Sequence, residues 1–463
     1  MVTKYDVIIV GGGPAGIFAA LELTQHSGLG VLLIEKGRDI DGRQCPARDR
    51  NGRCVTCTPC NLVCGLGGAG AYSDGKLTLS ADIGGRLVDY VGEDRTTDLI
   101  KYVDDTYRRF GAPDRLYGVG DGVDLMCHQA ALAGLRLEPV PIRHLGTDNC
   151  RFVLSSMRDY LGPHIDLKLG VSANSVAVND GRVTGIVTEA GDRYNCDYLI
   201  LAPGREGADW LSQEAKRLDL TMHNNPVDVG VRVEVPNMVM ETFCNALYEA
   251  KLEFFSPGFN DRIRTFCMCP EGEVILESTG GTEPVITVNG HSYADRKSGN
   301  TNFALLMSTS FTEPFHEPIA YGKYLARLAN ILSGGVLVQR FGDLMQGRRS
   351  TPSRIDEGLV RPTLVSATPG DLSFVLPYRH LAGIVDMLKA MDRLIPGVAS
   401  NHTLLYGVEV KFYSGRLQLS PGLETEVGNM FAAGDGAGVS RGLIQASVSG
   451  VVVAQAILSR VGH

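Results

Sequence analysis

The sequence lacks the features that mark several large classes of protein. It has no run of lysines and arginines, and with a net charge of −8 nothing in it attracts a nucleic-acid backbone. No apolar stretch approaches the roughly 20 residues that a membrane span needs. No internal repeat, low-complexity tract or obvious flexible linker is present. We therefore expect no nucleic-acid partner and no transmembrane segment.

Targeting signals are also missing from the sequence. The first strand is expected to begin by Tyr5, which leaves no room for a signal peptide, so we expect a cytoplasmic protein. Eleven cysteines in a long intracellular chain indicate thiols or metal ligands rather than disulfides. With 463 residues, 44% of them apolar and 21% charged, the chain has an ordinary globular composition and the length of two or three interleaved domains.

The N-terminal sequence predicts a dinucleotide-binding motif. Residues 6–10 form a nearly continuous apolar run, typical of a parallel strand buried on both faces. Gly11-x-Gly13-x-x-Gly16 follows, and residues 17–25 then show helical periodicity. In this motif the first glycine permits a tight turn, the second lets the backbone approach a pyrophosphate, and the third lets the helix lie close to the sheet. Because a helix N-terminus attracts phosphates, we expect cofactor contacts from Gly11, Gly13, Pro14, Ala15 and Gly16.

The second predicted strand supplies an acidic residue at the expected distance. Residues 30–37 read GVLLIEKG, and Glu35 follows Gly11 by 24 residues, close to the usual spacing of about 20. A carboxylate there accepts hydrogen bonds from both ribose hydroxyls and repels a 2′-phosphate, which argues against bound NADP. Lys36 is expected beside the same nucleotide. The alternative, a glycine-rich turn with no ligand, does not explain the strand, spacing, helix and acid together.

A second motif lies near the C-terminal end of the sequence. A short apolar strand stops at Gly434-Asp435, and a helix rich in small residues follows. The stretch resembles the C-terminal flavin motif of flavoproteins with two dinucleotide-binding domains, in which the aspartate binds the ribityl chain. By that resemblance Asp435 holds the ribitol, and the helix start with Leu443 and Ile444 faces the flavin pyrimidine, where reduction places negative charge. Small residues such as Gly450 would let this helix pack close to the cofactor.

A third motif connects the first two. Asn179-Asp180-Gly181 is a hairpin signal between alternating strands. The following DYLILAPG, with Ala202 and Gly204, resembles a strand-plus-glycine motif beside FAD, and the strand near Ala173 resembles the one that meets the adenine. Three motifs in this order identify FAD as the cofactor. No second nucleotide fold follows, so any NAD(P)H donor would bind only transiently.

A cysteine-rich segment separates the acidic strand from a glycine-rich loop. Cys54, Cys57, Cys60 and Cys64 have the spacing of bacterial ferredoxin cluster loops, and Cys45 lies nine residues before Cys54. No proline follows Cys64, and no second run of this kind exists. Three interpretations stay open. Four of the five thiolates ligate an iron–sulfur cluster that feeds single electrons to the flavin, or they hold a structural zinc, or the thiols are free or redox-active.

Residues 65–76, GLGGAGAYSDGK, follow the cysteines directly. Glycines at this density let backbone amides crowd an anion or a flat ring. We expect Gly68, Ser73 and Lys76 to contact the pyrophosphate or the flavin edge. The alternative is a flexible surface loop.

Several stretches together point to a known family. They are GLGGAGAYSDGKL, APGREGADWL, NNPVDVGVRVEVP, LPYRHLAGIVDML, LLYGVEVKFYSGRLQL and AAGDGAGVSRGLIQASVSGV. The chain resembles, over nearly its whole length, the bacterial FAD-dependent dehydrogenases described as NAD(FAD)-utilizing, and its cysteine loop resembles that of a subgroup. The resemblance implies an α/β fold. A discontinuous Rossmann-like FAD-binding domain, with a parallel sheet and a β-meander of the glutathione-reductase type, would carry a second, mixed α+β substrate or cap domain.

The expected domain boundaries follow from these motifs. The FAD-binding domain takes residues 1–80, 140–210 and 405–463, a helical excursion takes 81–139, and the second domain takes 215–400. Candidate catalytic residues are polar side chains in unusual surroundings, each of which has a structural role as its alternative. Adjacent arginines suit a substrate carboxylate or phosphate, and Tyr or His suits proton donation. The candidates are Lys76, His144, Arg349, Tyr378, His380 and Arg441.

Two functional hypotheses fit the sequence best. The first is an FAD-dependent oxidoreductase that transfers hydride between flavin N5 and an organic small molecule bound between the domains. The second is a redox-sensing or electron-carrying flavoprotein that acts on a protein partner through an apolar patch near residues 45–64. Flavin-dependent RNA modification is disfavoured by the acidic charge.

Overall fold

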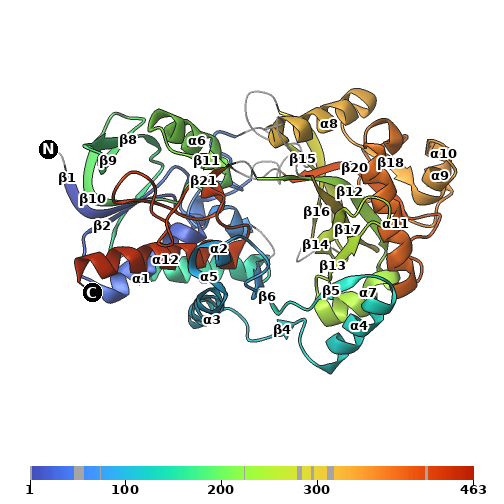
Figure 1. The fold of residues 1–463 in the computed structure, drawn as a ribbon, viewed down its shortest axis with the longest axis horizontal. Coiled ribbons are helices and arrows are strands. Elements are labelled where there is room, and N and C mark those ends of the chain that lie inside the picture. Colours follow the sequence, from blue (N-terminus) through green and yellow to red (C-terminus); the bar gives the residue numbers. More distant parts are fainter. Residues whose placement is uncertain are drawn as a thin grey trace. The chain divides into compact units, whose positions relative to one another are not determined.

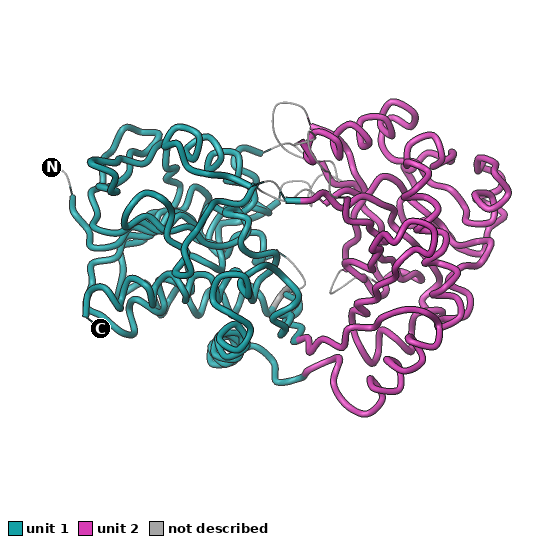
Figure 2. Tube along the Cα trace, in the orientation of Figure 1, with its two compact units in different colours: residues 1–115, 143–225, 414–463 teal, residues 116–142, 226–413 magenta. Residues whose placement is uncertain are grey.

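The chain divides into two compact units (Figure 2). Unit 1 comprises residues 1–115, 143–225 and 414–463, and unit 2 comprises residues 116–142 and 226–413. The computed structural model describes residues 3–45, 57–72, 75–223, 225–278, 284–292, 297–309, 317–411 and 415–462.

Unit 1 is built on a sheet whose central strands are parallel. The order is β7 (Asp166–Leu169), β2 (Val31–Glu35), β1 (Thr3–Val10), β10 (Arg193–Leu201), β9 (Arg182–Thr188) and β8 (Ala173–Asn179), and β22 (Met430–Ala432) also pairs with β10. β1, β2, β7, β10 and β22 pair in parallel, whereas β8, β9 and β10 form an antiparallel meander. The α/β class predicted from the sequence, with a Rossmann-like sheet and a meander, is confirmed.

Apolar strands and helices form the core of unit 1. The second half of β1 and all of β2 are buried, as expected for strands covered on both faces. The helices are α1 (Pro14–His26), α2 (Val88–Val91), α3 (Glu93–Arg109), α5 (Thr147–Leu161), α6 (Ala208–Arg217) and α12 (Leu443–Val461). α1 and α12 lie side by side (Figure 1).

A glycine lets these two helices approach closely. A Cβ atom at Gly450 would lie 2.0 Å from the backbone oxygen of Ala15 and 3.0 Å from the nitrogen of Ala19. The small residues of α12 predict that Gly450 packs against the cofactor. The structure assigns it instead to the contact between α12 and α1, because the nearest atoms belong to the backbone of α1.

The composition of α12 reflects this burial. Among the described helices it is long and apolar enough to cross a membrane by length and composition, and 72% of its most apolar window is buried inside the protein. The core helix of a soluble protein passes the same test, so the apolar character of α12 is explained by its packing in unit 1.

Unit 2 contains a second, mostly antiparallel sheet. Its order is β19 (Thr368–Pro369), β18 (Leu337–Arg340), β20 (Leu404–Lys411), β12 (Val227–Pro236), β17 (Asn300–Thr309), β14 (Arg262–Cys269), β13 (Lys251–Phe255) and β5 (Arg136–Glu138). β15 (Glu273–Ser278) and β16 (Ile286–His291) form a separate hairpin. The longer helices are α4 (Asp121–Leu132), α7 (Asn237–Leu247), α8 (Pro318–Ser333) and α11 (Tyr378–Leu394).

The segment 81–139 is divided between the two units. α3 places Leu99, Ile100 and Val103 in the core of unit 1. α4 places Val123 and Ala130 in the core of unit 2, and β5 becomes an edge strand of its sheet. α3 is clearly amphipathic, and the core that each helix joins depends on contacts distant in sequence.

Replacing Gly450 with alanine should destabilise unit 1. The new methyl group overlaps the backbone of α1, so the two helices must move apart. We expect a loss of about 3 kcal/mol in the free energy of unfolding, measured by calorimetry or denaturant titration. Gly28→Ala is the control, because a Cβ there meets no atom within 4 Å. Equal stability of the two variants would contradict the packing argument.

Candidate functional site

The glycine motif forms a tight turn between β1 and α1. Gly11 has φ +110°, and a Cβ atom there would lie 2.1 Å from the backbone oxygen of Ala202. A Cβ atom at Gly16 would lie 2.0 Å from the oxygen of Gly11. By contrast, the nearest atom to a Cβ at Gly13 is the Cα of Gly68, 4.0 Å away, so the front of the turn is open. No side chain caps α1, and its N-terminus is therefore suited to an anion.

Glu35 connects three segments through backbone amides. Its Oε2 accepts a hydrogen bond from the Gly12 amide at 2.8 Å, and its Oε1 accepts from Gly37 at 2.8 Å and Gly65 at 2.9 Å. The residue is 7% exposed. A carboxylate has about four lone-pair sites. With three of them used, Glu35 has room for fewer hydrogen bonds from a ribose than the sequence argument assumed.

Arg43 organises the loop that follows the cysteines, and the sequence argument missed it. Its guanidinium is completely buried and lies 4.9 Å from the centre of the Tyr72 ring. Burial lowers the pKa of this guanidinium. It donates to five backbone oxygens rather than to a carboxylate, and these belong to Asn61, Leu62, Gly65, Leu66 and Gly68. The only sequence signal was an arginine in a polar segment, which does not predict burial.

The C-terminal motif meets the first turn at the same edge of the sheet. Asp435 Oδ1 accepts from Ser440 Oγ at 2.7 Å and from the Gly442 amide at 3.3 Å, and Oδ2 lies 3.8 Å from Arg205 Nε. Burial raises the pKa of the Asp435 carboxyl, while Arg205 and Ser440 oppose that shift. The predicted contacts that the structure brings together here are Gly11, Ala15, Ala202, Gly204, Gly434 and Asp435.

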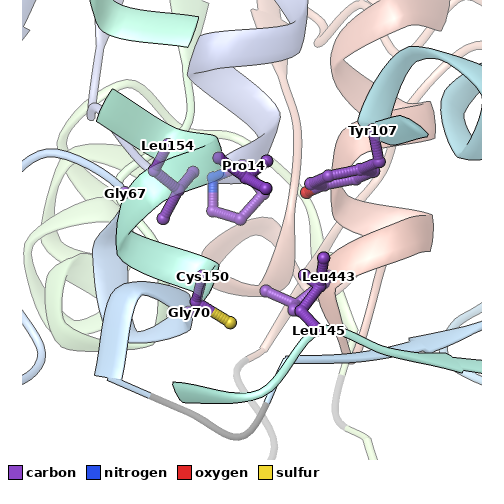
Figure 3. A pocket seen from close by; sticks show the side chains of 9 residues that line it. Pro14, Gly67, Gly70, Tyr107, Leu145, Cys150, Leu154 and Leu443 are labelled. Atoms are coloured by element: carbon purple, nitrogen blue, oxygen red, sulfur yellow. The ribbon is translucent and has the colours of Figure 1, made fainter. Parts of the chain in front are cut away.

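An apolar cavity lies beside this turn in unit 1 (Figure 3). The cavity is partly open, and its space of about 250 Å³ includes open solvent. Pro14 and Leu443, both predicted cofactor contacts, line it, as do Gly67 and Gly70 of the glycine-rich loop. Ile444, also predicted, is buried at the start of α12. The cavity thus joins the beginnings of α1 and α12 to the loop after the cysteines.

The remaining predicted contacts are more dispersed. Lys36 Nζ lies 3.7 Å from Glu206 Oε1. Ala173 begins β8, and the chain shortly before it passes the end of β2, where the Val171 amide donates to the Glu35 backbone oxygen at 3.1 Å. Lys76 begins β3 (Lys76–Thr78). Ser73 lies outside the described residues.

The described cysteines form no metal site. The Cys64 amide donates to the Cys60 oxygen at 2.9 Å, so these two residues share one helical turn. Burial raises the pKa of the Cys64 thiol to about 11. Cys45 and Cys57 are half-buried free thiols, and Cys54 lies outside the described residues. Within the described part of the chain no group of three or more His, Cys, Asp or Glu could hold a metal ion, so metal ligation is not shown.

The catalytic candidates fall into two sets. Lys76, His144 at the end of β6 (Ile142–His144), and Arg441 belong to unit 1. In unit 2, Arg349 is exposed and its backbone oxygen accepts from Arg354. The other two unit 2 candidates are Tyr378 and His380.

Tyr378 and His380 begin the same helix in opposite surroundings. Tyr378 is 79% exposed and lies edge-on to the Phe259 ring. His380 is buried, and its Nε2 lies 2.8 Å from Thr309 Oγ1. Burial lowers the pKa of His380 to about 4. The imidazole is therefore neutral at neutral pH, which disfavours His380 as a general acid.

Comparisons with known proteins agree with these motifs. Residues 5–51 match the family model described as pyridine nucleotide-disulphide oxidoreductase, and residues 226–412 match the model described as FAD-dependent protein, C-terminal domain-like. An uncharacterized protein of Clostridium beijerinckii is 28% identical over 99% of this chain and 81% of its own length. A vinyl phenol reductase of Lactiplantibacillus plantarum is 56% identical over 39 residues, 8% of each chain.

Two solved structures align with nearly the whole of this chain at low identity. Glycine oxidase from Geobacillus kaustophilus is 13% identical over 99% of this chain and 95% of its own, with a TM-score of 0.40. L-Proline dehydrogenase from P. horikoshii is 11% identical over the same shares, with a TM-score of 0.43. The two family models cover the glycine motif and most of unit 2, and they support FAD as the cofactor.

The buried imidazole of His380 should make stability depend on pH. Its folded pKa of about 4 lies below the ordinary value of 6.5, so the unfolded chain binds more protons between these values. The contribution of the neutral His380 to the free energy of unfolding is fully present above pH 6.5. It falls by up to about 3 kcal/mol as the pH drops toward 4. His380→Gln, which can still bond to Thr309, should reduce this loss, measured by denaturant titration from pH 7 to 4.5.

The control for this titration is His128→Gln, since His128 is an exposed histidine on α4 of the same unit. It should keep the pH dependence of the unaltered protein. The explanation is wrong if His380→Gln loses as much stability on acidification as that protein does.

Proposed function

We propose that this FAD-dependent oxidoreductase binds FAD across the carboxyl ends of the unit 1 strands and oxidises or reduces an organic small molecule. One observation carries the proposal. Gly11, Glu35, Ala202 and Gly434 stand at the ends of β1, β2, β10 and β22, which are parallel strands of one sheet. Carboxyl ends of parallel strands meet at one edge, where this class of fold binds nucleotides. FAD, when bound, supplies hydride transfer at flavin N5.

Separate residues of unit 1 suit the diphosphate, the ribose and the ribityl chain of such a cofactor. The open space at Gly13 and the uncapped start of α1 suit the diphosphate. Glu35 retains an acceptor site for a ribose hydroxyl, and Lys36 follows it. Asp435 is held in place by Ser440 and Gly442 and would hold the ribityl chain. Together these groups position the cofactor and leave its redox chemistry to the flavin ring.

The start of α12 would stabilise charge on the reduced cofactor. α12 begins at Leu443 with no side-chain cap, and Arg441 precedes it by two residues. A helix N-terminus and a guanidinium both favour a nearby anion. We therefore propose that Arg441 and the α12 amides stabilise the charge of the reduced flavin. Lys76 and His144, which also belong to unit 1, are proposed to lie near the same end of the cofactor. An NAD(P)H donor, if used, would bind only transiently.

For proton transfer to a substrate, Tyr378 is the stronger of the two α11 candidates. Its side chain is 79% exposed and so can meet a ligand, whereas His380 is buried and neutral at pH 7. Exposed Arg349 suits a substrate carboxylate or phosphate.

A second candidate function is electron exchange with a protein partner through the cysteine segment. This function is favoured because the cysteine segment runs directly into the nucleotide end of the site. Cys64 precedes Gly65, whose amide donates to Glu35 at 2.9 Å. An iron–sulfur cluster on the predicted cysteines would bring single electrons beside the nucleotide end of the site. Zinc on the same thiolates would instead stabilise the loop.

Asp435→Ala and Gly13→Glu should each weaken FAD binding at least about tenfold, equivalent to about 1.4 kcal/mol. The first removes the proposed ribityl contact. The second places a carboxylate where the diphosphate would lie, at a position whose φ of −78° a glutamate can adopt. Flavin absorbance per chain and a Kd from titration are the measurements. Asp98→Ala, an exposed carboxylate on α3, is the control. Stoichiometric flavin in both test variants would refute the assignment.

Metal analysis separates the interpretations of the cysteines. Protein purified without oxygen should contain stoichiometric iron with visible absorbance beyond that of flavin, or stoichiometric zinc without it. Cys57→Ser should lower the metal content, while Cys196→Ser, a buried thiol on β10, should not. If neither metal is present, both metal proposals fail and only the free-thiol interpretation survives.

A further inference from the structure

Two cysteines in unit 2 lie beside a buried arginine. Cys267 and Cys269 end β14, and the pairing of β14 with β17 shifts register between Phe266 and Cys269. Cys267 has φ +44°, a left-handed conformation that is uncommon for a residue other than glycine. The Cys269 sulfur lies 3.4 Å from the Cys267 oxygen, so it folds back over its neighbour. The bulge thus brings the Cys269 sulfur back toward Cys267.

The guanidinium of Arg232 is held against the Cys269 sulfur. Arg232 is completely buried on β12, and its Nη2 donates to the Cys267 oxygen at 2.5 Å and to Cys269 Sγ at 3.2 Å. Its Nε donates to Asn302 Oδ1 at 2.8 Å. A Cβ atom at Gly290 would lie 1.8 Å from Nη2, so the neighbouring strand leaves room for the guanidinium only because residue 290 is glycine. Arg232 therefore has little freedom to leave the sulfur.

Among the residues that the structure describes, the charged groups near this sulfur include more buried positive charge than buried negative charge. Glu409 Oε1 lies 3.4 Å from Arg232 Nη1 and 3.0 Å from Lys411 Nζ, so one buried carboxylate serves two cations. The next carboxylate, Glu277, is 3.7 Å from Lys411 and its side chain is 45% exposed. A thiolate on Cys269 would supply the missing negative charge. Nearby cations favour the thiolate form of cysteine, which is the nucleophilic form.

We propose that Cys267 and Cys269 form a dithiol that reduces small hydroperoxides, with Cys269 as the attacking thiolate held by Arg232. The Cys269 sulfur attacks one peroxide oxygen, the O–O bond breaks, and the leaving oxygen departs as hydroxide and takes up a proton. The Cys267 thiol then attacks the sulfenic sulfur, a disulfide forms, and water leaves. For hydrogen peroxide, two thiols lose two electrons and two protons, and two waters form. Cys267 is half-buried, whereas Cys269 is buried, so the attacking sulfur is reachable only by a small oxidant.

Mass spectrometry of the full-length holoprotein tests this reaction. Treatment with hydrogen peroxide, followed by N-ethylmaleimide and trypsin, yields a peptide of residues 265–296 that contains only these two cysteines. We expect this peptide to lose two hydrogens and to resist alkylation before the other thiols react. A peptide that remains fully alkylated while other cysteines oxidise would overturn the proposal.

Two single variants assign the roles of the sulfurs. Cys267→Ser should stop at a sulfenic acid on Cys269, which dimedone traps. Cys269→Ser should leave Cys267 reduced at the same dose. Cys244, a buried thiol on α7 whose sulfur lies 3.8 Å from Met268 Sδ, is the internal control, and we expect it to react at least about tenfold more slowly at pH 7. Equal reactivity of Cys269 and Cys244 would mean that Arg232 does not activate the sulfur.

The pH dependence of the reaction tests the thiolate without a substitution of Arg232, which is completely buried. In the Cys267→Ser protein, the rate of peroxide reaction at Cys269 should rise with a midpoint below the ordinary cysteine value of about 8.5. A midpoint at or above that value would show that Cys269 is a neutral thiol that donates to the Cys267 oxygen, and the proposal would fail. Because flavin content is read separately by absorbance, this failure is distinguishable from failure of the FAD proposal.

Discussion

The carboxylate of Glu35 is the interaction on which the candidate site depends. It accepts hydrogen bonds from the Gly12, Gly37 and Gly65 amides, which belong to the first turn, the end of β2 and the loop after the cysteines. A buried carboxylate is costly unless donors surround it. Here its donors are the backbone itself, so the charge that would bind a ribose also fixes the shape of the turn. Removing that charge would therefore loosen all three segments together.

Arg43 has the opposite charge and a matching role. It is buried and donates hydrogen bonds to backbone oxygens between residues 61 and 68. The start of the glycine-rich loop is thus held by an anion that accepts from the Gly65 amide and a cation that donates to the oxygens of Gly65, Leu66 and Gly68. These hydrogen bonds restrain the backbone at the start of the loop. They explain how a segment whose glycines predict flexibility can line a cavity with Pro14 and Leu443.

Sequence reasoning succeeded where a local backbone requirement leaves a residue signature. Gly11 with φ +110° and Gly434 with φ +77° occupy conformations that glycine adopts readily, and both stand at strand ends that the pattern predicts. The α/β fold and the FAD cofactor follow from those positions. Burial of Arg43 and Arg232 could not be predicted, because the partners of Arg232 lie up to 177 residues away. The division of residues 81–139 between two cores was hidden for the same reason, since amphipathicity does not identify the partner surface.

The two buried arginines have different hydrogen-bond partners. This difference indicates a structural role for Arg43 and a chemical role for Arg232. The five hydrogen bonds of Arg43 go to neutral backbone oxygens, which replace water, and its guanidinium also lies against the Tyr72 ring. Arg232 meets one carboxylate that it shares with Lys411, one amide oxygen, one carbonyl and one ionisable sulfur. Of the two arginines, Arg232 is the one whose hydrogen-bond partners include a group that can gain a negative charge, the Cys269 sulfur. A buried cation whose remaining partner is a thiol therefore favours a reactive sulfur, whereas one surrounded by carbonyls favours an ordered loop.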